Sequence, residues 1–122
     1  MHRIVKHLNK SKAISLETAW KYKNLQTTSP NDTSIARTLG QEDGSIEAID
    51  SIIDMIKSGI YQKAVVNHFK HMKAKADRNY KILTDGYILE DIFTAHGFYT
   101  IGRHYGASRA YGYALELIEG LR

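Results

Sequence analysis

The chain has 122 residues, of which 43% are hydrophobic and 25% are charged, and this composition predicts one soluble globular domain over residues 1–122. The absence of cysteine excludes disulfides, thiolate metal sites and cysteine nucleophiles, and it agrees with a cytoplasmic location. No run is apolar enough to span a membrane and no secretory signal follows the basic N-terminus, so we expect neither a membrane protein nor a secreted one.

The net charge of +4 is distributed in blocks. Residues 1–24 hold six lysines and arginines against one glutamate, and residues 57–81 hold seven against one aspartate. Between them, residues 32–54 hold six acidic side chains against one arginine. Such blocks predict a surface divided by sign, which orients a protein on a polyanion. Solvated helix faces that neutralise each other inside the fold would give the same pattern.

Hydrophobic spacing predicts an all-α protein, a compact bundle of about six or seven helices. Residues 26–33 form a predicted loop, and Asn31, Asp32 or Thr33 is expected to cap the helix that follows. Glycines mark most of the other boundaries. The expected helices, in chain order, cover residues 11–25, 33–40, 46–57, 60–83, 87–97, 98–106 and 108–122.

The segment IGRHYGASRAYGYALELI, residues 101–118, has the spacing of a helix-turn-helix unit. An apolar residue and a small one, Ile101 and Gly102, would lie on the first helix, and Gly106 would make the turn. Ser108 is a suitable cap for the second helix, whose packing face would carry apolar side chains. Residues 87–122 are therefore predicted to contain a C-terminal helix-turn-helix.

The first turns of the second helix would point into a major groove of DNA. We expect Ser108, Arg109 and Tyr113 to face base edges there. Phosphate contacts are assigned to Arg103, His104 and Tyr111.

On these residues, the stretch resembles the helix-turn-helix superfamily of bacterial and phage DNA-binding regulators. With YILEDIFTAHG in front of it, the segment is similar to the C-terminal helix-turn-helix of sigma-type factors over about 35 residues. The resemblance implies a DNA-binding transcription regulator, and paired half-sites would make it a homodimer. The sequence departs from the pattern at Gly112, where an apolar packing residue is usual, and Glu116 and Glu119 disfavour phosphate.

A second segment, residues 35–52, aligns with residues 101–118 without gaps. Its packing positions fit the pattern better, but Glu42, Asp43 and Glu47 would repel phosphate. The pair is either a tandem repeat with one DNA-reading copy or two matches in a helical bundle.

A lysine-rich segment, FKHMKAKADRNYK, offers another surface. Its side chains would follow a phosphate backbone without reading sequence. The alternative is an exposed helix face that pairs with the acidic block. The basic residues assigned to DNA here are Lys70, Lys73, Lys75 and Arg78, with Lys81 beside Tyr80.

No pattern indicates enzymatic chemistry. His68 and His71 share a helix face without a carboxylate that would complete a metal site, and the glycines form no phosphate-binding loop. We therefore expect no enzyme activity, no metal and no cofactor. The predicted function is regulation of transcription through double-stranded DNA. The alternative is a helical protein-interaction module that modulates another machine, such as RNA polymerase or a nuclease, through its acidic residues 42–54.

Overall fold

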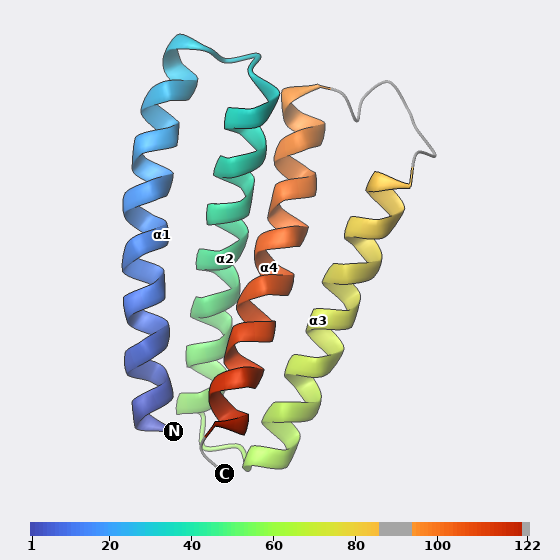
Figure 1. The fold of residues 1–122 in the computed structure, drawn as a ribbon. Helices are drawn as coiled ribbons and strands as arrows, with labels where there is room; N and C mark the ends of the chain where they lie inside the picture. The colour runs from blue at the N-terminus through green and yellow to red at the C-terminus, as the bar shows by residue number, and fades with distance from the viewer. Residues whose placement is uncertain (86–93, 121–122) are drawn as a thin grey trace.

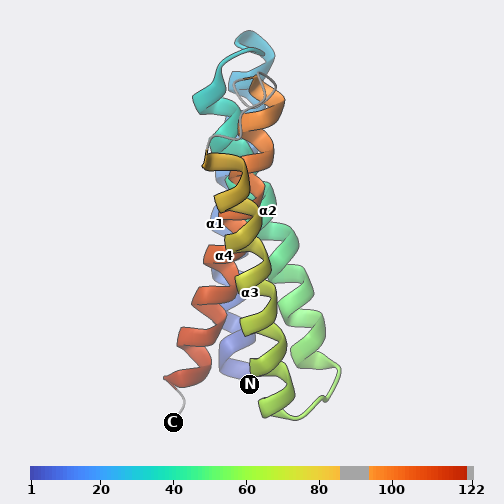
Figure 2. The same cartoon turned by 90° about the vertical axis from the view of Figure 1, so that its right-hand side faces the viewer.

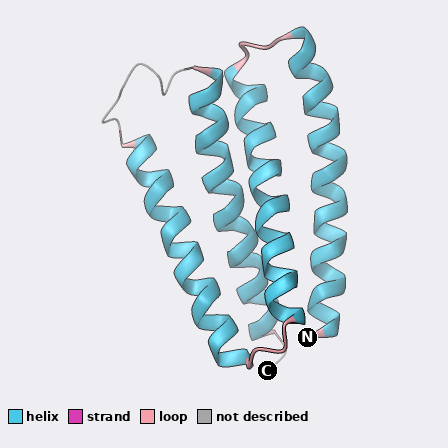
Figure 3. Cartoon of the chain, turned by 180° about the vertical axis from the view of Figure 1, so that it is seen from behind, coloured by secondary structure: helices cyan, strands magenta, loops and turns pink. Residues whose placement is uncertain are grey.

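A computed structural model describes residues 1–85 and 94–120 of the chain. The described residues form four long helices: α1 (His2–Thr28), α2 (Thr33–Lys57), α3 (Gln62–Thr84) and α4 (Ala95–Glu119). No strand occurs among these residues, as Figure 3 shows. The all-α class is confirmed, but the predicted six or seven helices are wrong.

The polar cap at the start of α2 was predictable, whereas Thr94, which caps α4, lies inside the helix predicted over residues 87–97. Asp32 caps α2, because its carboxylate accepts the backbone N–H groups of Ser34 and Ile35 at 2.9 and 3.1 Å. Gly59, with a φ of +80°, lies two residues after the last residue of α2, in the left-handed conformation that favours glycine. Most of the predicted helix over residues 87–97 lies outside the described residues.

The four helices lie in the order α1, α2, α4, α3 across the molecule (Figure 1). The chain runs up α1, down α2, up α3 and down α4, so the two central helices are parallel neighbours. The outer helices α1 and α3 lie at opposite edges, with α3 in front and α1 behind in the turned view (Figure 2).

Glycine explains why the helices are fewer and longer than predicted. Gly40 and Gly44 lie inside α2, and Gly102 and Gly106 lie inside α4. A Cβ atom on any of these four glycines would overlap a backbone carbonyl of the other central helix. The glycines therefore allow two helix backbones to touch and do not end either helix.

The same contact accounts for the similarity between residues 35–52 and 101–118. Each segment contributes a stripe of small, buried residues at intervals of four, and the two stripes face each other across the α2–α4 contact. The members are Ala36, Gly40, Gly44 and Ala48 on α2, with Gly102, Gly106, Ala110 and Ala114 on α4.

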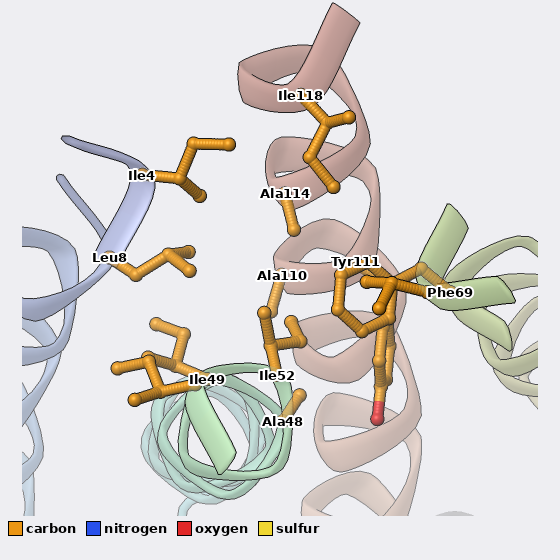
Figure 4. Packing of buried hydrophobic residues seen from close by; sticks show 12 residues of the cluster. Ile4, Leu8, Ala48, Ile49, Ile52, Phe69, Ala110, Tyr111, Ala114 and Ile118 are labelled. Carbon is orange, nitrogen blue, oxygen red and sulfur yellow. The ribbon is translucent and has the colours of Figure 1, made fainter. Parts of the chain in front are cut away.

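The apolar core occupies one end of the bundle, where all four helices meet (Figure 4). Phe69 of α3 packs on Tyr111 of α4 with ring centroids 5.8 Å apart, and Ile52 of α2 is fully buried between the helices. Each such side chain stabilises the fold by about 1.5–3 kcal/mol. The cluster consists of Ile4, Leu8, Ala48, Ile49, Ile52, Ile53, Val65, Phe69, Ala110, Tyr111, Ala114 and Ile118.

Substitution of two glycines in α4 tests the backbone contact. In Gly106→Ala the new methyl group would overlap the Gln41 carbonyl, so we expect a loss of about 1–3 kcal/mol in the free energy of unfolding. Gly112→Ala is the matched control, because its methyl group meets only the end of the Lys73 side chain at 3.3 Å. Alanine there should be neutral or gain up to about 1 kcal/mol of helix propensity. Urea denaturation of both variants measures the difference, and equal midpoints would contradict the contact.

Candidate nucleic-acid interface

The predicted recognition helix is the second half of α4. No turn interrupts α4 at Gly106, and Ser108 lies inside the helix and not at its start. The predicted C-terminal helix-turn-helix is therefore wrong as a local structure. The physical reason is the backbone contact described above: Gly106 is buried against α2, where a helical conformation is required and a turn would break the packing.

Two of the predicted base-reading residues are not free to enter a groove. Ser108 is buried and its hydroxyl donates a hydrogen bond to the Asp77 carboxylate of α3. Tyr113 is partly buried against the apolar core. Only Arg109 is exposed, and its guanidinium lies 5.8 Å from the centre of the Tyr105 ring.

The predicted phosphate contacts of α4 are engaged inside the chain as well. Arg103 forms an ion pair with Glu47 of α2 at 2.5 Å. Tyr111 is 4% exposed and belongs to the core. Burial, and then the neighbouring Arg103 charge, lower the pKa of His104, which favours the neutral imidazole over the charged form that would attract phosphate.

Three of the six acidic side chains in residues 32–54 bond to α4 or α1, and none of these three pairs with a lysine of α3. Asp43 accepts a hydrogen bond from the Tyr99 hydroxyl at 2.6 Å, one helical turn before the Glu47–Arg103 pair. Asp50 pairs with Lys12 of α1 at 2.6 Å. Neutralisation of the α3 lysines by the acidic block was the alternative reading of the sequence, and these contacts do not support it.

The basic side chains of α3 therefore remain largely unpaired. Lys73 forms an ion pair with Asp77 one turn away at 2.9 Å. The other five are exposed, and none of them joins an ion pair with another described residue. We name this set the α3 basic edge; it consists of Lys63, Lys70, Lys75, Arg78 and Lys81.

Polar and aromatic contacts hold the second half of α3 against the central helices. The Arg37 guanidinium of α2 donates a hydrogen bond to the Tyr80 hydroxyl at 3.0 Å. Tyr80 in turn packs on Tyr105 of α4 with ring centroids 5.6 Å apart. Hydrogen bonds from Lys73 and Ser108 lower the pKa of Asp77, which keeps this carboxylate ionised as their acceptor. These contacts hold α3 in one rotation about its axis, so the α3 basic edge faces away from the central helices.

Sequence reasoning missed Arg37 and Tyr99 as members of these contacts. The contact between Tyr105 and Arg109 could have been inferred from the sequence, because these residues lie one helical turn apart. The pairings of Arg37 with Tyr80 and of Tyr99 with Asp43 join different helices, and no local pattern encodes them.

No helix within residues 1–85 and 94–120 is long and apolar enough to cross a membrane. Over the same residues, no three histidine or acidic side chains gather in a way that could hold a metal ion. Comparisons of the chain with models of protein families, with curated proteins and with solved structures found no match.

A proline substitution distinguishes a continuous α4 from a helix-turn-helix. In Ala107→Pro the ring removes a helical hydrogen bond and clashes with the preceding turn, at a cost of about 3 kcal/mol in a helix interior. In a turn before a cap at Ser108, the same substitution would be tolerated. Ala95→Pro is the control, because proline is accepted in the first turn of a helix. Thermal denaturation of the two variants measures the effect, and unchanged stability of Ala107→Pro would contradict the continuous helix.

The contact between Tyr99 and Asp43 predicts a loss of stability at high pH. Burial, reinforced by the hydrogen bond to Asp43, raises the pKa of Tyr99 from 10.0 to about 12. Between these values the folded protein keeps a proton that the unfolded chain has lost, so the stability contribution present below pH 10 decreases as pH rises towards 12. Urea denaturation at about pH 9 and about pH 11 should show a smaller loss in Tyr99→Phe than in the parent. An equal loss in both proteins would contradict this assignment.

Proposed function

We propose that the protein binds the phosphate backbone of double-stranded DNA through the α3 basic edge, without a helix-turn-helix. The observation that supports this proposal is the set of five exposed basic side chains that no described acidic residue neutralises. Unpaired lysines and arginines release counterions from DNA when they meet phosphates, which supplies affinity that does not depend on base sequence.

The arrangement of the edge fits an extended polyanion. Lys63, Lys70, Arg78 and Lys81 recur at intervals that keep them on one face of α3, opposite its buried residues Val65, Phe69 and Ala76. From Lys63 to Lys81 the helix rises by about 27 Å, which is a length of about eight base pairs. The contacts of Tyr80 and Asp77 with α2 and α4 hold this face outward.

The central helices contribute little to this binding in the proposal. Arg109 of α4 lines a groove of about 610 Å³ to which all four helices contribute, together with the carboxylates of Glu42 and Glu116. These carboxylates would repel phosphate. Base reading by Arg109 is therefore not part of the proposed mechanism, and regulation of transcription, phage origin and a homodimer remain predictions from the sequence.

Salt dependence tests the proposal directly. Binding to a random-sequence duplex should weaken with salt along a log–log slope of about −4.5, as expected for five phosphate contacts. The triple variant Lys70→Ala/Arg78→Ala/Lys81→Ala should reduce the slope to about −2 and lower the affinity at low salt. Fluorescence anisotropy of a labelled duplex measures both quantities.

A matched variant separates the edge from net charge alone. Arg3→Ala/Lys10→Ala/Lys21→Ala removes the same charge from exposed positions of α1, at the opposite edge, and should keep the slope. Arg109→Ala should bind as the parent does. Equal weakening by the two triple variants, or a collapse of binding in Arg109→Ala, would overturn the assignment to α3.

A further inference from the structure

One flank of α1, beside α2, carries apolar side chains that the other described residues leave exposed. One face of α1 packs on α2 through Ile4, Leu8 and Ala19. Another face carries side chains at intervals of three and four residues, including Leu16 at 49% exposure and Trp20 at 70%. We call this face the α1 stripe; it begins at Val5, which is partly buried against the core, and its exposed members are Asn9, Ala13, Leu16 and Trp20.

The surface along the α1 stripe is hollowed in two places. A groove of about 390 Å³ runs between α1 and α2 beside Leu16 and Trp20, with Ile46 of α2 among its lining residues. Further along the same helix, Val5 and Ala13 line a shallow depression of about 460 Å³. Exposed tryptophan beside an apolar groove is typical of the anchor residues of protein interfaces.

The charged side chains beside the α1 stripe indicate which kind of partner would bind there. His2, Lys6 and Lys10 line the depression, and Lys23 lines the groove. None of these lysines forms an ion pair with another described residue. The two acidic side chains that line the groove, Asp43 and Glu47, are already bonded to Tyr99 and Arg103 of α4.

We infer that the α1 stripe binds an acidic amphipathic helix of a partner protein. Apolar side chains of that helix would pack on Leu16 and Trp20, and its flanking carboxylates would meet Lys6, Lys10 and Lys23. The stripe rises by about 22 Å from Val5 to Trp20, which suits a partner helix of about 15 residues. A second copy of this chain fits poorly, because pairing α1 with itself would oppose six lysines and arginines on each helix with only one glutamate each.

The inference is independent of the proposed binding of DNA, because α1 and α3 lie at opposite edges. Trp20 is the one tryptophan of the sequence, so its fluorescence reports directly on this surface. The probe is a synthetic helical peptide of leucine, alanine and glutamate, with leucine at intervals of three and four residues. A control peptide has lysine in place of glutamate.

On addition of the acidic peptide to the full chain, Trp20 emission should move to shorter wavelength as the indole leaves water. Anisotropy of the labelled peptide should show that Trp20→Ala weakens binding about 30-fold, in line with loss of an interface anchor. Lys6→Ala/Lys10→Ala should weaken it about 2- to 10-fold. The control is Tyr61→Ala, an equally exposed aromatic residue between α2 and α3, which should leave binding unchanged.

Several results would overturn the inference. Each of three results would contradict it: the acidic peptide does not bind at all, the lysine peptide binds as tightly as the acidic one, or Trp20→Ala binds the acidic peptide as tightly as Tyr61→Ala does. A shift of Trp20 emission with protein concentration alone, together with a dimer in sedimentation, would assign the stripe to a second copy. A shift of Trp20 emission on addition of duplex DNA, together with weaker anisotropy of a labelled duplex in Trp20→Ala than in Tyr61→Ala, would assign it to nucleic acid. Circular dichroism of each variant verifies that the helices are intact.

Discussion

The direct contact between the backbones of α2 and α4 is the constraint on which the rest of the structure depends. It requires small residues on both helices, and it leaves the flanking positions to polar pairs such as Asp43 with Tyr99 and Glu47 with Arg103. Because each central helix uses one face for the other, α1 and α3 can pack only on the remaining sides. The two most basic helices therefore lie at opposite edges, and the acidic residues lie between them.

The helical class and the cap of α2 by Asp32 could be predicted, because each depends on local spacing and local hydrogen bonds. The number of helices could not. A glycine inside a helical pattern either ends the helix or allows another backbone to approach closely. The sequence of one segment is the same in both cases, so it cannot distinguish them. At Gly40, Gly44, Gly102 and Gly106 the second case holds. The small residues recurring every fourth position were the available signal, and they appeared as an apparent repeat.

The candidate site, like the fold, could be predicted from the sequence only in part. The lysine-rich half of α3 was recognisable from composition, and its exposure follows from its edge position. The partners of Arg103, Ser108 and Tyr111 were not recognisable, because Glu47, Asp77 and Phe69 come from other helices far away in sequence. Tyrosine and arginine suit DNA, protein interfaces and interior packing equally well, so residue type alone could not separate these roles.

The parallel arrangement of α2 and α4 also has a consequence for the order of folding. Gly40 packs on the backbone of Tyr99 although about 60 residues separate them, so closing this contact requires the intervening chain to be ordered or looped out. The α1–α2 pair, by contrast, joins neighbours across a short connection. We expect this antiparallel pair to form early and α4 to dock late, because contacts distant in sequence slow folding. Until α4 arrives, the glycines of α2 lack the packing that offsets their poor helix propensity, so the middle of α2 should be the last part of that helix to gain protection from hydrogen exchange.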